Sequence, residues 1–243
     1  MTTSSTSRPS SLSRLACRLA LLVGLGGLTG GAWGASPPPA GLAAETAPTS
    51  AEALVATVRV GDIVFTRIDV LPFRKVAAAT GSWTNHVGVV IGHDGPMPLV
   101  AESTFPWSRV TPMSDFVARS QAGRVAVRRL SRPLDAADQA RLAAAAGRRL
   151  GIRYDTGFDL DSRGQFCSRF VHEVVEEALG ERAGQVQTLA ELLAEQPDTG
   201  LGFWRVWFLG RIPWERRTMT PASLLRDPGL QWVFDGRVAG RGH

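Results

Sequence analysis

Apolar residues cluster in four short segments in the first half of the chain. The segments GDIVFTR, HVGVVIG, PLVAES and RVAVRRL span residues 61–67, 86–92, 98–103 and 124–130. Short runs rich in Val and Ile, bounded by Gly, Pro or charged residues, predict strands. The second and third segments flank HDGP, a turn signature, so we predict that they pair as a hairpin.

Two later segments have the pattern of helices. Residues 135–150 are alanine-rich, with acids early, arginines late and Gly151 as a stop signal. A second helix is predicted to begin near Cys167 and to end at Gly180. Its apolar face comprises Phe166, Phe170, Val171, Val174, Val175 and Ala178. Strands combined with these helices predict an α+β domain.

The first 57 residues do not fit that domain pattern. Residues 1–34 contain three arginines, no acidic residue and an apolar, glycine-containing run, which predicts a signal peptide and an exported protein of the periplasm or cell envelope. Residues 35–57 are rich in Pro, Ala and Thr and predict a flexible linker. We therefore expect a single domain over 58–243.

The charge of the chain argues against a nucleic-acid partner. Removing the three leader arginines from 27 basic residues leaves 24 against 22 acidic residues, a balance of +2. No concentrated basic stripe or nucleic-acid-binding motif is present. We expect no nucleic acid among the partners.

Cleavage of the leader would leave Cys167 as the one cysteine of the mature chain. A lone thiol is often a small buried core residue, and that interpretation competes with a catalytic one. At the first turn of a helix, however, the backbone N–H groups and the helix dipole favour a thiolate. His172 lies about 140° around the same helix and cannot face Cys167 locally. His93 falls in the predicted turn and His243 in a Gly/Arg tail, which leaves His86.

A hairpin centred on Asp94 would place His86 directly opposite Glu102. The same register pairs Val87, Val89 and Ile91 with Ala101, Leu99 and Met97 on the other face. A carboxylate that orients an imidazole, together with a helix-start thiol, makes a catalytic triad of Cys, His and Glu. The His and Cys spacing matches no metal-binding pattern, so we predict no metal and no cofactor.

The chain order His86, Glu102, Cys167 resembles the permuted papain-like amidases of the NlpC/P60 superfamily, the YiiX/YebB-like group. The resemblance rests on GDIVFTR, WTNHVGVVIG, VAES and GIRYDTGFDLDSRGQFCSRFVHEVV, with TMTPASLLRDPGLQWV near the C-terminus. It implies a circularly permuted papain-like fold in which a small antiparallel sheet or barrel packs against helices.

The resemblance also implies roles for individual residues. Cys167 would be the nucleophile of a cysteine amidase, His86 the general base and Glu102 the orienting residue. Tyr154 would donate near the oxyanion, and Trp83 and Ser168 would contribute to the oxyanion or substrate site. Asp155 and Asp159 are more typical of a hydrogen-bonded turn, and Arg169 stands where many relatives carry an acid, which would change contacts near the nucleophile.

The substrate is left open between a peptidoglycan-derived peptide and a lipid-linked acyl group, cleaved at an amide, ester or thioester bond. The alternative is a non-catalytic envelope or lipid-binding module that retains the fold. Residues 200–217, GLGFWRVWFLGRIPWERR, are dense in aromatic and cationic residues. They predict either a cap on the core or a membrane-surface contact through Trp204, Trp207 and Trp214.

Overall fold

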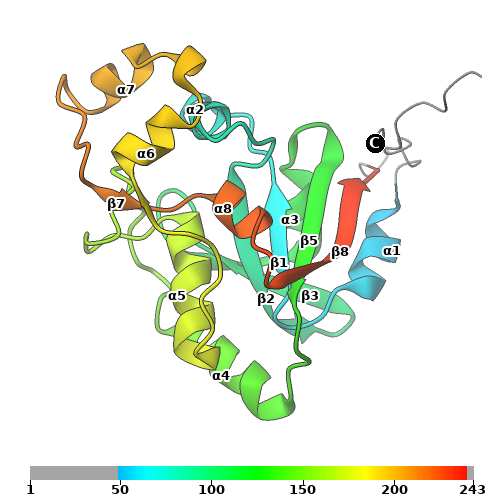
Figure 1. Ribbon diagram of the computed structural model, residues 1–243. Helices are drawn as coiled ribbons and strands as arrows, with labels where there is room; N and C mark the ends of the chain where they lie inside the picture. The colour runs from blue at the N-terminus through cyan, green and yellow to red at the C-terminus, as the bar shows by residue number, and fades with distance from the viewer. Residues whose placement is uncertain (1–48, 240–243) are drawn as a thin grey trace, which may run out of the picture. The chain divides into compact units, whose positions relative to one another are not determined.

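The computed structural model describes residues 49–239, and its central feature is an antiparallel sheet (Figure 1). Within that range the sheet has six strands in the order β4-β3-β2-β1-β5-β8. Their bounds are β1 Ile63–Thr66, β2 His86–Asp94, β3 Met97–Glu102, β4 Arg109–Pro112, β5 Arg124–Leu130 and β8 Leu230–Arg237. All four predicted strands are present, and the expectation of an antiparallel sheet packed against helices is confirmed. The predicted signal peptide and His243 lie outside the described residues.

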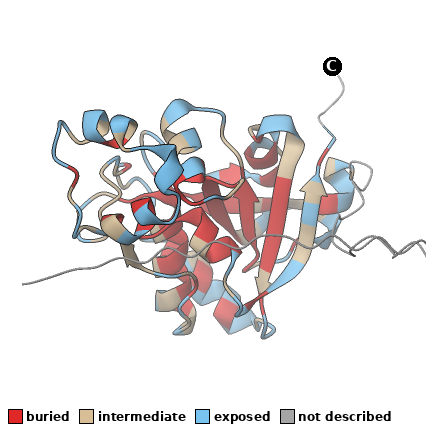
Figure 2. Ribbon diagram, turned by 45° about the horizontal axis from the view of Figure 1, so that its top comes forward, coloured by how far each residue is buried: buried red, intermediate tan, exposed pale blue. Residues whose placement is uncertain are grey.

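Both faces of the sheet are covered, which explains why its strands read as nearly continuous apolar runs (Figure 2). On one face Phe65 and Val89 pack against the two helices that the sequence predicted, α4 (Ala136–Gly147) and α5 (Cys167–Leu179). On the other face Val64 and Val100 pack against α1 (Ala51–Thr57) and α3 (Met113–Ala118).

The ends of α4 and α5 follow from local chemistry. Asp135 caps α4 in a reciprocal capping box with Asp138. Gly180 ends α5 in the left-handed conformation, with φ of 70°, which a residue without a Cβ adopts at little cost. Both predicted helices are therefore confirmed to within a few residues of their predicted ends.

The linker prediction is wrong for its last residues. Ala51–Thr57 form helix α1, capped by the Ser50 side chain, and the Leu54 side chain is 1% exposed within the core of one sheet face. A single apolar residue per helical turn is enough to anchor such a short helix when the sheet offers an apolar surface. The folded domain therefore begins before Val58.

A third apolar cluster joins the remaining helices beside the sheet. It contains Val76 and Ala79 from α2 (Leu71–Ala79), Leu193 from α6 (Leu189–Ala194) and Trp204 from α7 (Gly202–Trp207). The short helix α8 (Pro221–Leu225) and the strand pair β6 (Gln187–Thr188) and β7 (Arg217–Thr218) complete this part, with 3-10 turns at Gln121–Gly123 and Pro197–Thr199. Among the described residues, no helix is long and apolar enough to cross a membrane.

The β2–β3 hairpin has a different register from the predicted one. Val89 pairs with Ala101 and Asp94 with Met97, with an irregularity between Val90 and Gly92. The turn is centred later than Asp94, and the bulge adds one residue to β2, so Glu102 lies diagonal to His86 instead of directly opposite. Because the combined shift is two residues, both side chains stay on the same face of the sheet.

Replacing Leu54 by Ala tests whether α1 belongs to the folded domain. The substitution removes a fully buried side chain, so we expect the free energy of unfolding to fall by about 2–5 kcal/mol. Urea denaturation measures this change. Glu52→Gln, an exposed change in the same helix, is the control and should stay within about 0.5 kcal/mol of the parent. If Leu54→Ala and the parent are equally stable, α1 does not belong to the folded domain and is part of the linker.

Candidate active site

The three predicted catalytic residues lie at one end of the sheet. His86 is the first residue of β2 and Glu102 is the last residue of β3. These strands are antiparallel, so their opposite ends are neighbours. Cys167 is the first residue of α5, which packs against the same sheet. The structure therefore brings together residues that are up to 81 positions apart in the chain.

Glu102 is a fully buried carboxylate with three close partners. Its Oε2 lies 2.6 Å from His86 Nε2. Its Oε1 accepts hydrogen bonds from Thr111 Oγ1 at 2.6 Å and from Arg119 Nη2 at 2.7 Å. The Glu102 side chain is 0% exposed, and His86 is 1% exposed. A buried charge is tolerated only when it is paired and hydrogen-bonded in this way.

The pairing sets the protonation states of both groups. Burial alone would raise the pKa of Glu102, but the hydrogen bond and charge of His86, followed by Arg119 and Thr111, lower it to about 2. Burial alone would likewise lower the pKa of His86, but hydrogen bonding and charge interactions with Cys167 and Glu102 raise it to about 9. At neutral pH the structure favours a carboxylate beside an imidazolium.

The His86 ring is held so that its second nitrogen can serve Cys167. The ring centroid lies 5.5 Å from that of Phe116 and 6.2 Å from that of Phe73. Nε2 is hydrogen-bonded to Glu102, whereas the buried Nδ1 has no hydrogen-bond partner among the described residues. The Cys167 side chain interacts with this ring. The order carboxylate, imidazole, thiol is that of a nucleophile with its base and orienting group.

Tyr154 is a buried donor near the thiol. Its hydroxyl makes no formed hydrogen bond, and it interacts with Cys167. Burial, followed by the interaction with Cys167, raises the pKa of Tyr154 well above its usual value. The hydroxyl therefore keeps its proton at neutral pH and can donate it toward negative charge that develops beside Cys167.

The start of α5 leaves backbone donors for the same purpose. Phe166 occupies the N-cap position and makes no side-chain capping hydrogen bond. The first N–H groups of a helix have no intrahelical acceptor. Together with the Tyr154 hydroxyl, these groups can stabilise an oxyanion next to the Cys167 sulfur.

Ser168 and Trp83, the two further predicted site residues, differ in their position relative to Cys167. The Ser168 hydroxyl donates to the Met219 carbonyl at 3.0 Å, and Ser168 is also among the residues that line the cavity beside Cys167. Trp83 is half-buried against the core, and the Arg124 guanidinium lies 4.7 Å from its ring centroid. Trp83 is not among the residues that line the cavity beside Cys167.

Arg169 and the neighbouring aspartates organise the loop before α5. Arg169 Nη1 donates to the carbonyls of Ser162 and Gly164, each at 2.9 Å. Asp155 accepts from the N–H of Gly157 at 2.8 Å, as expected for a turn residue. His172 makes a 2.7 Å hydrogen bond to the Ala183 carbonyl and packs away from Cys167, as its helical position predicts.

An apolar cavity opens beside the thiol. The cavity holds about 20 Å³, room for one water-sized molecule, and is lined by Cys167, Tyr154, Pro221, the polar residues Asn85, Ser168, Thr218 and Thr220, and a set of large apolar side chains. These are Phe73, Val76, Phe158, Phe166, Leu189, Leu192, Trp204 and Met219. Helices α2, α6 and α7, together with the segment before α8, therefore form walls around the candidate nucleophile.

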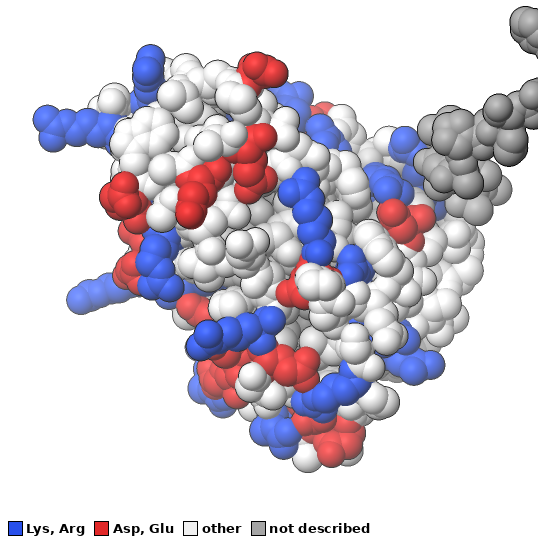
Figure 3. All heavy atoms as spheres, viewed as in Figure 1, with Lys and Arg blue, Asp and Glu red and all other residues white. Residues whose placement is uncertain are grey.

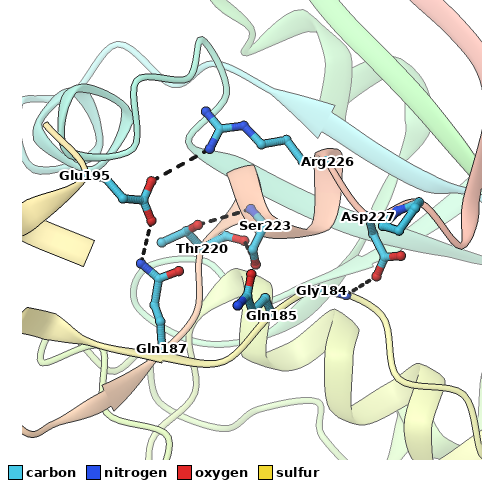
Figure 4. Close-up of a pocket in the computed structure, with 9 residues that line it drawn as sticks. Gly184, Gln185, Gln187, Glu195, Thr220, Ser223, Arg226 and Asp227 are labelled. Atoms are coloured by element: carbon cyan, nitrogen blue, oxygen red, sulfur yellow. Dashed lines mark hydrogen bonds and ion pairs between the residues drawn. The ribbon is translucent and has the colours of Figure 1, made fainter. Parts of the chain in front are cut away.

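A second, polar pocket of about 250 Å³ adjoins this cavity, because Thr220 lines both. Figure 4 shows Glu195 and Arg226 facing one another across it, at 3.7 Å between their charged atoms. Gln187 donates to Glu195 at 2.8 Å from a neighbouring segment. The site thus combines an apolar cavity at the thiol with a polar pocket next to it.

Comparison with known proteins identifies the class to which this fold and site belong. Residues 57–234 match the model of the family described as permuted papain-like amidase enzyme, YaeF/YiiX, C92 family. The chain belongs to this family.

Two relatives from Escherichia coli illustrate the relationship. The uncharacterized protein YiiX of strain K12 is 30% identical over 173 residues, which cover 71% of this chain and 84% of YiiX. The crystal structure of metalloprotein YiiX from strain O157:H7 superposes with a TM-score of 0.67 at 27% identity, covering 74% of this chain and 99% of that one. The permuted papain-like fold implied by the sequence is thereby confirmed.

The description of the solved relative as a metalloprotein raises the question of whether a metal fits this site. Both Glu102 oxygens already accept hydrogen bonds, and His86 Nε2 is engaged by Glu102. Only His86 Nδ1 and the Cys167 sulfur are left, which is too few ligands for a structural or catalytic zinc. Among the described residues, no group of three or more His, Cys, Asp or Glu side chains is arranged to hold a metal ion. The donor set here does not fit a metal.

Sequence reasoning missed the residues that support the triad. Thr111 and Arg119 hold Glu102, yet they lie on β4 and at the end of α3, and no motif connects them to the histidine. Their signal would have been the buried carboxylate itself, which requires donors that the His86 ring alone does not supply. Of the two roles predicted for Trp204, a cap on the core or a membrane contact, its burial fits the first: it is 3% exposed and lines the cavity.

Substituting Glu102 by Gln tests the electrostatic coupling. A neutral amide no longer stabilises the imidazolium, so the pKa of His86 should fall from about 9 toward or below the value of about 6.5 for a free histidine. Titration of the His86 ring resonances by NMR measures this shift. Glu176→Gln, the same chemical change on a solvent-facing part of α5, should leave the titration of His86 unaltered.

Proposed function

We propose that this protein is a thiol-dependent hydrolase that cleaves the amide bond of an acylated, lipid-linked substrate through a thioester at Cys167. The observation that carries the proposal is the placement of Cys167 between the His86–Glu102 pair and an apolar cavity. The same chemistry would act on esters and thioesters.

The acyl group would enter at the cavity and displace its apolar walls, because the space now open there, about 20 Å³, is smaller than an acyl chain. Aromatic and aliphatic side chains make up most of the lining, with Asn85, Ser168, Thr218 and Thr220 as its polar members, whereas a peptide would need polar partners for each of its N–H and C=O groups. The adjoining pocket around Glu195 and Arg226 suits a polar leaving group. This division favours an acyl chain over the peptidoglycan-derived peptide, which we retain as an outcome of the test below.

The reaction has two half-steps. The Cys167 thiolate attacks the carbonyl carbon, and the oxyanion is stabilised by N–H groups at the start of α5 and by the Tyr154 hydroxyl. The C–N bond then breaks, and the His86 imidazolium gives its proton to the departing amine. In the second half-step His86 takes a proton from water, whose oxygen attacks the thioester carbonyl. The C–S bond then breaks, the carboxylic acid leaves, and the Cys167 thiolate and the His86 imidazolium are restored.

Glu102 does not transfer a proton in this scheme. With its pKa lowered to about 2, it stays ionised and holds the His86 ring by Nε2, which leaves Nδ1 without another hydrogen bond and available to Cys167. Arg119 and Thr111 are positioning residues, because they act on the substrate only through Glu102.

We also propose that the reaction takes place after export, in the periplasm or at the cell envelope. The support is the arginine-rich, acid-free and apolar pattern of residues 1–34. Lipid-linked acyl groups are available in that compartment. Fractionation of cells that produce the full chain would locate the protein.

Replacing Cys167 by Ala removes the nucleophile and should lower kcat/KM by at least about a thousandfold on a series of fluorogenic N-acyl amides. In the parent, mass spectrometry of a rapidly quenched reaction should detect the acyl group on Cys167. Muropeptides and acyl thioesters are assayed alongside. Turnover of muropeptides alone would reassign the substrate to the cell wall. Binding of acyl chains without turnover of any substrate would instead identify a lipid-binding module that retains the fold.

Narrowing the cavity tests where the acyl chain lies. Leu192→Phe adds volume to the wall of the cavity, so we expect kcat/KM for long acyl chains to fall about tenfold while that for an acetyl amide is unchanged. Val76→Phe probes the opposite wall in the same way. If both variants fold and kcat/KM falls equally for short and long acyl chains, the acyl group binds elsewhere.

A further inference from the structure

The turn after α7 exposes apolar side chains to solvent. We define the α7 tip as residues 205–211, RVWFLGR. Val206 is 79% exposed and Leu209 is 94% exposed. These fractions exceed those of all other large apolar residues in the described part of the chain. Exposing two apolar side chains at one turn is energetically unfavourable in water, and packing among the described residues covers little of either side chain.

The backbone at Leu209 makes this exposure harder to explain by folding. Leu209 adopts a left-handed conformation with φ of 51° directly after the C-cap of α7. Glycine or asparagine is the usual residue there, because other side chains are strained in that conformation. A leucine at this position adds strain and contributes almost no packing, so a folding role does not explain it.

Cationic side chains stand at both ends of the exposed pair. Arg205 and Arg211 are exposed, and neither makes a side-chain hydrogen bond or ion pair with the described residues. In Figure 3, cationic side chains project from the corner that Figure 1 labels α7, while acidic side chains lie nearer α6. Apolar side chains flanked by unpaired arginines complement a surface with an apolar interior and anionic headgroups.

The α7 tip is attached directly to the cavity wall. Trp204, one residue before the tip, lines the cavity beside Cys167, and its ring stacks on that of Phe208 within the tip. Trp207 is fixed by a 2.9 Å hydrogen bond from its Nε1 to the Thr156 carbonyl. The aromatic residues therefore form a base on the protein, from which Val206 and Leu209 project outward.

We propose that the α7 tip docks on an anionic lipid bilayer, with Val206 and Leu209 inserted at the headgroup boundary and Arg205 and Arg211 on the phosphates. This differs from the contact predicted from the sequence, because Trp204 is buried and Trp207 is hydrogen-bonded to the domain. A second copy of the chain is a poorer occupant. A stable protein interface buries roughly 800 Å² per partner, more than two projecting side chains supply.

The proposal goes beyond the hydrolase function and does not require the chemistry at Cys167. Docking by the α7 tip would bring the wall of the apolar cavity close to the bilayer surface, where lipid-linked acyl groups are found. The two proposals therefore fit together but can fail separately.

Leu209→Gly provides the sharpest test. Glycine relieves the left-handed backbone, so the melting temperature should be unchanged or higher, while the membrane partition coefficient should fall several-fold. Val206→Ser combined with Leu209→Ser should lower the partition coefficient at least about tenfold. Co-sedimentation with phosphatidylcholine vesicles that contain phosphatidylglycerol measures binding. A chain that lacks residues 1–42 is used in parallel with the full chain so that the leader does not mask the effect.

The arms of the experiment separate the explanations. Arg205→Gln with Arg211→Gln should weaken binding to anionic vesicles and leave binding to pure phosphatidylcholine unchanged. Leu150→Ser removes a 38% exposed apolar residue beyond α4 and should bind as the parent does. All measurements are repeated in Cys167→Ala, where binding should persist even if no hydrolysis is ever found.

Two results would overturn the proposal. One is equal vesicle binding by the parent, Leu209→Gly and the double serine variant. The other is that the parent does not bind vesicles while the tip variants sediment at a different velocity from the parent. This result would show that the α7 tip mediates self-association. Turnover of a soluble short-chain amide by the double serine variant should match the parent, because neither residue lines the cavity.

Discussion

The buried charge of Glu102 is the constraint on which the site depends. A carboxylate with no solvent exposure is stable only if every oxygen is matched by a donor, and here the donors come from three elements: His86 on β2, Thr111 on β4 and Arg119 at the end of α3. The sheet therefore has to bring β2, β3 and β4 together in one register, and α3 has to pack against them. The arrangement of the candidate site follows in large part from satisfying this one group.

The two faces of the sheet contribute different parts of the candidate site. One face carries α1 and α3, which support the Glu102 network through Phe116 and Arg119. The other carries α4 and α5, and α5 presents Cys167 at its first residue. The thiol and the imidazole meet where the end of the sheet meets the end of the helix. Neither layer alone would position both groups.

The segment from α6 to α8 supplies much of the lining of both pockets beside Cys167. Leu192, Trp204 and Met219 enclose the thiol in an apolar cavity, while Glu195 and Arg226 border the polar pocket next to it. In helix α7 the Trp204 side chain is buried in the cavity wall, whereas Val206 is 79% exposed to solvent. One short helix thus links the wall of the cavity to the external surface that we propose contacts lipid.

Much of this could be read from the sequence, since the strands, the two main helices and the triad candidates depend on local patterns of apolar residues, caps and glycines. The His86–Glu102 contact was predicted on a wrong register and is nevertheless present, because a shift of two residues preserves the face of a strand. The helical character of residues 51–57 could not be read, and the choice between a buried and a membrane-facing Trp204 stayed open, because both depend on an apolar surface that other segments supply. The sequence by itself determined which groups are available for chemistry. The tertiary structure decided which donors hold Glu102, how the cavity is lined and which apolar side chains stay exposed, because these depend on contacts between residues far apart in the chain.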